Sequence, residues 1–193
     1  MEACALRTEI LGVGFDDLTI EEAADRASAL LEEEGFHYVV TPNPELVDRA
    51  RREETFREAL NGADLVLPDG IGVVYAARLL GRSLKGRCPG IDFAGKLMER
   101  MARKGQRLYL LGAKPGVAEA AAARLEVRYP GLTICGVHDG YFQEDGPVVE
   151  DIRKAGADVV FVCLGFPKQE YWMVKSGPAT GARLLAGLGG SLD

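Results

Sequence analysis

Six short polar segments, each placed directly after an apolar run, carry the residue types best suited to chemistry. They combine glycines and prolines with hydroxyl, amide, carboxylate and basic side chains. The segments are residues 41–45 (TPNPE), 69–72 (DGIG), 112–116 (GAKPG), 138–142 (HDGYF), 165–170 (GFPKQE) and 188–193 (LGGSLD). Ligands of open parallel sheets bind outside the carboxyl ends of the strands, so six segments at that edge could line one extended cleft. Each segment alone is also an ordinary turn.

The clearest candidate for a catalytic group is Asp69. It follows a buried apolar run and precedes Gly70 and Gly72, where a helix is expected to begin. An ionised carboxylate at the rim of a cleft could act as a general base and take the proton of an acceptor hydroxyl. Such assistance is worth roughly a hundred- to ten-thousand-fold in rate. Asp-Gly is also a common turn, and from this pair alone that alternative stays open.

Thr41, Asn43 and Arg87 are candidate substrate-binding residues. Two prolines stiffen the segment TPNPE, so Thr41 and Asn43 would present a hydroxyl and an amide suited to sugar hydroxyls. Asn43 is equally well explained as the N-cap of a helix beginning at Pro44, and both roles can hold. Arg87 lies in the compact loop KGRCPGID, where its guanidinium could clamp a pyrophosphate through two hydrogen bonds. The nearby cations, from Arg78 onward, are expected to be solvated at a helix end.

Three of the segments suit a nucleotide. Residues 112–116 could turn backbone N–H groups toward a phosphate, although they match neither the dinucleotide fingerprint nor the Walker pattern. Lys114 could contact a phosphate, but an exposed loop lysine explains it better. Residues 138–142 and 165–170 offer aromatic and amide groups for a base and a ribose, and capping of a helix accounts for one of the Gln-Glu pair but hardly for both. The nucleotide-binding candidates are Gly112, Lys114, Tyr141, Gly165, Gln169 and Glu170.

The elements that must position these residues alternate between short β-rich runs and stretches of helical period. This alternation predicts an α/β fold, a single domain over residues 1–193 with a Rossmann-like, mostly parallel sheet and helices on both faces. The expected strands are 37–41, 64–68, 107–111, 133–137, 158–164 and 183–187, nearly continuous in Val, Ile and Leu as burial on both faces requires. The expected helices are 20–34, which opens with a Thr19/Glu22 capping box, 71–80, closed by Gly81, 91–104, closed by Gly105, and 117–128.

Composition narrows the class of function. With 193 residues, 47% hydrophobic and 27% charged, the chain can fill one globular core. Its net charge of −6 disfavours binding of nucleic acid or anionic lipid by the chain as a whole, so any phosphate must be bound by local groups. Four scattered cysteines (Cys4, Cys88, Cys135 and Cys163) and two histidines (His37 and His138) indicate neither a metal site nor a disulfide framework, and favour the cytoplasm. Without a signal peptide or spanning run, contact with a membrane is expected to be peripheral.

The segments TPNPELV, ADLVLPDGIGVV, RCPGIDF, GYF, GFPKQEYW and GLGGSLD together, in order and over nearly the whole chain, resemble the WecG/TagA/CpsF glycosyltransferase family. The resemblance implies an inverting, metal-independent transfer without a cofactor. The sugar would pass from a UDP donor to the 4-hydroxyl of N-acetylglucosamine on undecaprenyl diphosphate, at the inner face of the cytoplasmic membrane. In the TagA-like branch, which these segments resemble most, the donor is UDP-N-acetylmannosamine and the product is the linkage unit of wall teichoic acid.

Carried over to this chain, the resemblance makes Asp69 the base, and Thr41, Asn43 and Gln169 substrate contacts. Arg87 would bind the acceptor diphosphate or the charge developing on UDP. No Asp-x-Asp metal motif is evident, so arginine, backbone N–H groups and helix N-termini would stabilise the leaving group. Family members continue past the GGSLD-like loop into an Arg-rich, apolar segment. A membrane-associating segment is therefore expected to be missing after Asp193, which predicts a chain that folds but is largely inactive.

Other functions stay open beside this reading. A related UDP-sugar transferase of the enterobacterial common antigen or capsule type would use the same site with a different N-acetylhexosamine. A nucleotide-dependent oxidoreductase or epimerase is disfavoured because no strand leads into Gly-x-Gly-x-x-Gly. A catalytically silent module that binds a sugar nucleotide or a lipid diphosphate would show binding without turnover. A homo-oligomer is compatible with each of these.

Overall fold

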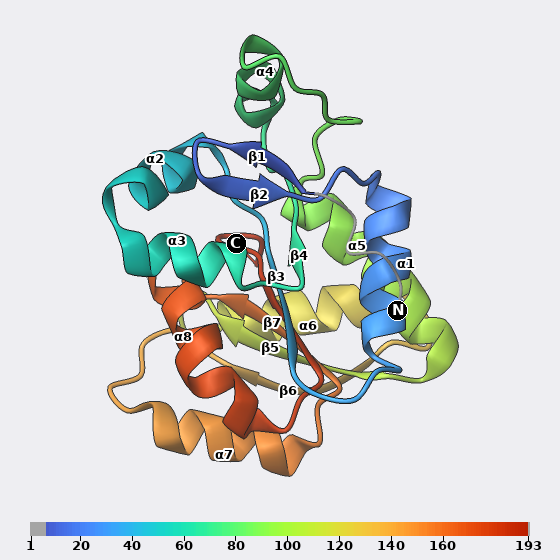
Figure 1. Ribbon diagram of the computed structural model, residues 1–193. Coiled ribbons are helices and arrows are strands. Elements are labelled where there is room, and N and C mark those ends of the chain that lie inside the picture. The colour runs from blue at the N-terminus through green and yellow to red at the C-terminus, as the bar shows by residue number, and fades with distance from the viewer. Residues whose placement is uncertain (1–6, 193) are drawn as a thin grey trace.

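A parallel sheet of six strands forms the centre of the protein in a computed structural model, which describes residues 7–192 (Figure 1). The strand order is β4-β3-β8-β7-β5-β6, and each neighbouring pair is parallel. The strands are β3 (His37–Val40), β4 (Leu65–Val66), β5 (Arg107–Gly112), β6 (Thr133–His138), β7 (Val159–Cys163) and β8 (Leu184–Gly187). All six expected strands are therefore confirmed, as is the α/β class.

Helices cover both faces of the sheet, as expected from the alternating pattern. One face lies under α1 (Ile20–Leu30), α5 (Gly90–Lys104) and α6 (Val117–Arg128), which pack on the side chains of Val39, Leu108 and Phe161. The other lies under α2 (Pro44–Arg52), α3 (Glu54–Asn61), α7 (Asp145–Ala155) and α8 (Lys168–Ser176). Successive strand residues point to opposite faces, so each strand contributes to both hydrophobic cores.

Burial along the strands explains their composition and one exception. Every residue of β3, β7 and β8 is buried, which matches the continuous apolar runs. The expectation of burial on both faces is wrong for β6, where Thr133 is exposed and the other residues are half-buried. β6 is at the edge of the sheet, so one side of it lacks a strand neighbour.

Helix ends follow local chemistry. The capping box of α1 is present: Glu22 N donates to Thr19 Oγ1 at 3.3 Å and Thr19 N to Glu22 Oε2 at 2.8 Å. The helix ends at Leu30 rather than at residue 34, because three consecutive glutamates would place negative charge at the negative end of the helix dipole. α5 ends as expected at Gly105, which takes the left-handed conformation with φ 65°.

An antiparallel hairpin that the sequence pattern did not indicate covers the β4 edge. It is formed by β1 (Thr8–Ile10) and β2 (Val13–Phe15). Asp16, just after the hairpin, accepts from Val66 N at 2.7 Å and donates its own N–H to Val66 O at 2.9 Å. The helices α3 and α7 were also not expected.

Within residues 7–192, no helix combines the length and apolarity needed to cross a membrane. Cys4 and Asp193, the latter being the point after which a membrane-associating segment was expected, lie outside the described residues.

Candidate functional site

The carboxyl edge of the sheet gathers the six polar segments. Along the chain, β4 is added outside β3 at one edge of the sheet, whereas β6 is added outside β5 at the opposite edge, and β8 and β7 lie between these pairs. Where the order of strand addition reverses in this way, the loops on either side separate and leave a crevice at the carboxyl ends of the strands, where ligands of open α/β sheets bind. Because the six strands are parallel, the segments that follow them come to this same edge, as predicted.

The segments after β3, β4 and β8 are tied together around Asp69. Thr41 Oγ1 donates to Gly187 O at the end of β8, at 3.1 Å. Asp69 N donates to Pro42 O at 3.2 Å. Gly90 N, at the start of α5, donates to Asp69 Oδ2 at 3.4 Å. The predicted base and the predicted contact Thr41 thus share a small region that also includes the start of α5.

The turn after Asp69 can approach the TPNPE segment only because it contains glycine. A Cβ on Gly72 would lie 2.7 Å from Pro44 Cγ, closer than real contacts allow. Asn43 Oδ1 accepts from Glu45 N at 2.9 Å and from Leu46 N at 3.1 Å, which confirms its N-cap role. Since these bonds use the side-chain oxygen, Asn43 would meet a sugar through Nδ2.

The environment of Asp69 suits a proton acceptor. Burial raises the pKa of the Asp69 carboxyl, and the Gly90 N–H and the positive charge of Arg87 partly oppose this shift. A carboxyl group whose pKa is raised by burial is a stronger proton acceptor than an exposed one. Perturbed carboxyl groups of this kind gather at functional sites.

Arg87 lies in the connection between α4 (Ile71–Leu79) and α5, with its side chain exposed. Cys88 N donates to Pro68 O at 2.7 Å, which fixes this connection beside the strand end that carries Asp69. Arg87 therefore lies close enough to Asp69 for its positive charge to lower the pKa of the Asp69 carboxyl, as expected for two residues of one site.

The segments after β5, β6 and β7 form a second cluster. Ala113 N donates to Cys163 O at 3.2 Å and Gly140 N to Ala113 O at 2.9 Å. Lys168 Nζ then donates to Gly140 O at 2.9 Å. Gly112 has φ 135°, and a Cβ there would lie 2.2 Å from Cys163 O, so the close approach of β5 and β7 requires glycine. Its predicted contact with a nucleotide stays a prediction.

Exposed groups of this second cluster could serve a nucleotide. Tyr141 is exposed over 69% of its surface, Lys114 is also exposed, and Gly165 adopts φ 72°. Lys168 was not among the predicted site residues, and its Nζ lies 4.4 Å from the centre of the Phe142 ring. The lysine in GFPKQE could have indicated this from the sequence, and its position among the three segments makes Lys168 a candidate phosphate ligand.

Gln169 joins the two clusters. It is only 4% exposed; its Nε2 donates to Glu170 Oε1 at 2.8 Å, and its Oε1 accepts from Gly189 N at 3.0 Å. Glu170 has no exposed surface, and burial raises the pKa of its carboxyl. Glu170 Oε2 makes no hydrogen bond to the described residues. Glu170 is therefore buried beside Gln169 and fixes its amide group, and its predicted contact with a nucleotide stays a prediction.

Comparison with known proteins shows the family of the chain. The profile of the Glycosyl transferase WecG/TagA/CpsF family matches residues 8–193. The chain belongs to the WecG/TagA/CpsF glycosyltransferase family. A relative from Staphylococcus aureus (strain MRSA252), named N-acetylglucosaminyldiphosphoundecaprenol N-acetyl-beta-D-mannosaminyltransferase, is 34% identical over 190 residues, which are 97% of this chain and 74% of the relative. The proteins of the same name from strains NCTC 8325 / PS 47 and COL match to the same extent.

A cavity of about 1120 Å³ in this glycosyltransferase opens between α5 and α6. Its lining includes residues at the start of both helices and after β8: Ile91, Asp92, Gly116, Val117, Leu188 and Ser191. Helix starts offer backbone N–H groups to anions such as a diphosphate. Lys114, Tyr141 and Gln169 do not line this cavity, so a nucleotide between their segments stays a prediction.

Among residues 7–192, no three His, Cys, Asp or Glu side chains lie close enough to hold a metal ion. The polar segments of the candidate site contribute the cations Lys114 and Lys168, and the connection between α4 and α5 contributes Arg87.

Proposed function

We propose that this glycosyltransferase moves N-acetylmannosamine from UDP-N-acetylmannosamine to the 4-hydroxyl of N-acetylglucosamine on undecaprenyl diphosphate. The transfer inverts the anomeric centre, needs no metal or cofactor, and builds the linkage unit of wall teichoic acid. The main support is the Asp69 carboxylate, half-buried between the Gly90 N–H and Arg87. The printed name of the Staphylococcus aureus relatives supports the sugar and the acceptor.

In this mechanism Asp69 takes the proton of the acceptor 4-hydroxyl while the oxygen attacks the anomeric carbon. The bond from that carbon to the diphosphate oxygen breaks, and UDP leaves with the bonding electrons. Arg87 and the backbone N–H groups at the helix starts stabilise the charge that develops on the leaving group. Thr41 and Asn43 hold the sugars, and Gln169 contacts them when the 188–192 segment, which its side chain holds through Gly189 N, moves aside. Gly112, Lys114, Tyr141 and Gly165 face the nucleotide.

The acceptor carries a lipid, so the protein acts as a peripheral protein at the inner face of the cell membrane. Residues 1–193 form the catalytic domain, and a membrane-associating segment after Asp193 stays part of the proposal. The expectation that the 193-residue chain turns over slowly is tested by comparing it with a form extended by the part of a Staphylococcus aureus relative beyond the matched region.

The proposal is tested by incubating both forms with several UDP-sugars and a lipid-diphosphate N-acetylglucosamine, and identifying the products by mass. UDP-N-acetylmannosamine should give one added N-acetylhexosamine, equally well with a chelator present. An acceptor that lacks the 4-hydroxyl is the matched control and should give no product. Transfer from another UDP-N-acetylhexosamine only, dependence on a divalent ion, or UDP binding without transfer by the extended form would each contradict the proposal.

A further inference from the structure

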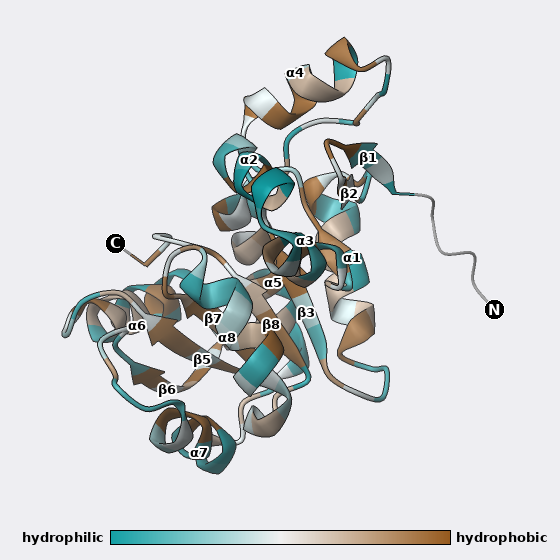
Figure 2. Ribbon diagram, turned by 60° about the vertical axis from the view of Figure 1, so that its left-hand side comes forward, coloured by the Kyte–Doolittle hydropathy of each residue, from teal (hydrophilic) through white to brown (hydrophobic). Residues whose placement is uncertain are grey.

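The helix α4 stands apart from the rest of the molecule. Figure 1 shows it projecting beyond the β1–β2 hairpin, and in Figure 2 it carries brown, hydrophobic segments despite this position. Leu79 is exposed over 89% of its surface and Tyr75 over 58%, and Ile71 is also exposed. These three residues are spaced by four, so they share one face of the helix. A helix of a globular protein normally turns such a face inward.

The inner face of α4 is already occupied. Val73, Val74 and Ala77 are buried. Val73 and Ala76 line a small cavity together with Ile10 of the hairpin. The outer face is therefore not a surface that the body of the protein could bury by a small adjustment.

Cations border the outer face of α4. Arg78 lies seven residues after Ile71, on the same side of the helix. Arg82 lies just beyond the helix end, after Gly81, and is also exposed. Within residues 7–192, neither has an acidic partner at ion-pair distance, whereas Lys85 pairs with Glu22 at 2.8 Å. In a chain with net charge −6, this face is locally positive.

We propose that the outer face of α4 docks on an anionic lipid bilayer. Ile71, Tyr75 and Leu79 would enter the interface between headgroups and acyl chains, and the guanidinium groups of Arg78 and Arg82 would bind lipid phosphates. Tyrosine and arginine suit this depth because each joins an apolar body to a polar end. The inference rests on the proposed function, in which the acceptor is lipid-linked.

The position of α4 relative to the candidate base supports this surface. Asp69 lies two residues before the helix, and Arg87 lies in the connection that follows it. Lys85 and Cys88 fix that connection to the body through Glu22 and the Pro68 carbonyl. A bilayer against α4 would bring lipid headgroups beside the carboxylate, where the acceptor diphosphate must arrive. From the sequence, membrane contact was expected only after Asp193, and these arginines were expected to be merely solvated.

Co-sedimentation of the 193-residue chain with vesicles tests the proposal. The chain should bind vesicles containing phosphatidylglycerol and bind much more weakly to pure phosphatidylcholine. The double variant Tyr75→Ser/Leu79→Ser should bind vesicles at least about tenfold more weakly, because it lacks two apolar side chains that would be buried in the bilayer. Arg78→Gln/Arg82→Gln should weaken binding and reduce its dependence on salt. Circular dichroism checks that each variant is folded.

Matched controls lie elsewhere on the surface. Val127→Ser removes an apolar side chain that is 82% exposed on α6, and Arg103→Gln removes an exposed cation from the end of α5. Both should bind vesicles like the unaltered chain. Equal losses in the controls, or no loss in the α4 variants, would overturn the proposal. If the chain ignores vesicles but self-associates, and the α4 variants are monomeric by sedimentation equilibrium, the face joins two copies and the lipid proposal is wrong.

Activity separates this inference from the function on which it rests. In the extended form, the α4 variants should slow transfer to an acceptor embedded in vesicles and leave transfer to a water-soluble, short-chain acceptor unchanged. Equal slowing with both acceptors would place the effect in the active site and contradict docking. If neither acceptor is used by the unaltered protein, the proposed function fails, while vesicle binding still decides the role of α4.

Discussion

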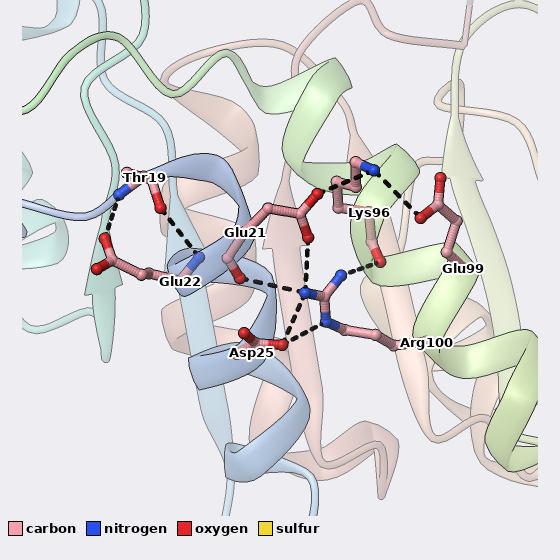
Figure 3. A network of polar contacts seen from close by, with 7 residues as sticks. All are labelled: Thr19, Glu21, Glu22, Asp25, Lys96, Glu99 and Arg100. Carbon is pink, nitrogen blue, oxygen red and sulfur yellow. Dashed lines mark hydrogen bonds and ion pairs between the residues drawn. The ribbon is translucent and has the colours of Figure 1, made fainter.

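The two helices on either side of the candidate base use their arginines in opposite ways. In α5, Arg100 is only 15% exposed at its side chain and pairs with Glu21 at 2.9 Å and Asp25 at 2.7 Å, both on α1 (Figure 3). Lys96 pairs with Glu21 at 2.9 Å in the same network. In α4, Arg78 finds no acidic partner among the described residues and lies beside exposed apolar side chains.

This difference separates charges that hold the protein together from charges available to a partner. α5 buries Phe93, Leu97 and Met101 in the core, and Lys96 and Arg100 next to this inward face pair with α1. α4 has partners on one face only. Exposed ion pairs contribute little individually, so the network matters for the alignment of α5, whose first residue donates to Asp69.

The largest expected effect concerns the carboxylate that both helices flank. Asp69→Asn should lower turnover by roughly a hundredfold or more, because an amide cannot take the acceptor proton. UDP affinity by calorimetry and vesicle binding should stay unchanged, since neither helix is altered. Glu45→Gln, at an exposed carboxylate in the neighbouring segment, is the control and should keep its activity. Full activity of Asp69→Asn would assign the base to another residue.

A smaller effect is expected at Arg87, which tests whether guanidinium geometry matters close to Asp69. Arg87→Lys should lower turnover by about tenfold, since an ammonium group cannot replace two parallel charge-assisted hydrogen bonds to a diphosphate. Arg82→Lys, in the same connection, keeps the charge and should leave turnover with a soluble acceptor unchanged. Steady-state turnover of both variants with a soluble acceptor tests whether the guanidinium group of Arg87 is required. Equal tolerance of lysine at the two positions would remove Arg87 from the site.

The α1–α5 network should affect stability rather than docking. Arg100→Gln should lower the free energy of unfolding by about 1 kcal/mol, as expected for a partly exposed network. This corresponds to a fall in Tm of about 2–4 °C for a protein of this size. Arg103→Gln, on the same helix but exposed, should change neither. Thermal unfolding and co-sedimentation together test the comparison, and a loss of vesicle binding in Arg100→Gln would break it.

The smallest effect is a dependence on pH at the start of α1. Hydrogen bonds from Lys85 and Thr19 lower the pKa of Glu22 from 4.5 to about 2. A carboxyl with a lowered folded-state pKa stabilises the protein above its unfolded pKa, and this contribution is lost as the pH falls from about 4.5 toward 2. Glu22→Gln should therefore flatten the acid side of the unfolding profile. Glu126→Gln, on α6, is the control and should keep the pH dependence of the unaltered protein. If Glu22→Gln also kept that pH dependence, the ion pair between Glu22 and Lys85 would be contradicted.

Local patterns in the sequence predicted much of the fold. Continuous apolar runs marked the strands because both faces of a parallel sheet are buried, and the Thr19/Glu22 and Asn43/Pro44 pairs marked helix starts because capping depends on residues three apart or fewer. The pattern of parallel strands also placed Asp69 and Thr41 at one edge. The same reasoning missed the hairpin, whose three-residue strands carry too little alternation to be noticed.

The family and the candidate residues were available from the order of short motifs along the chain, because each motif is contained within a few consecutive residues. Contacts between distant residues supplied the rest. The bond from Gly189 to Gln169 joins two strand ends, the burial of Glu170 depends on how α8 packs, and the outward face of α4 is exposed because the hairpin and α2 cover only its other side. Helical spacing shows which residues share a face, whereas packing against the rest of the chain determines which face is left for a partner.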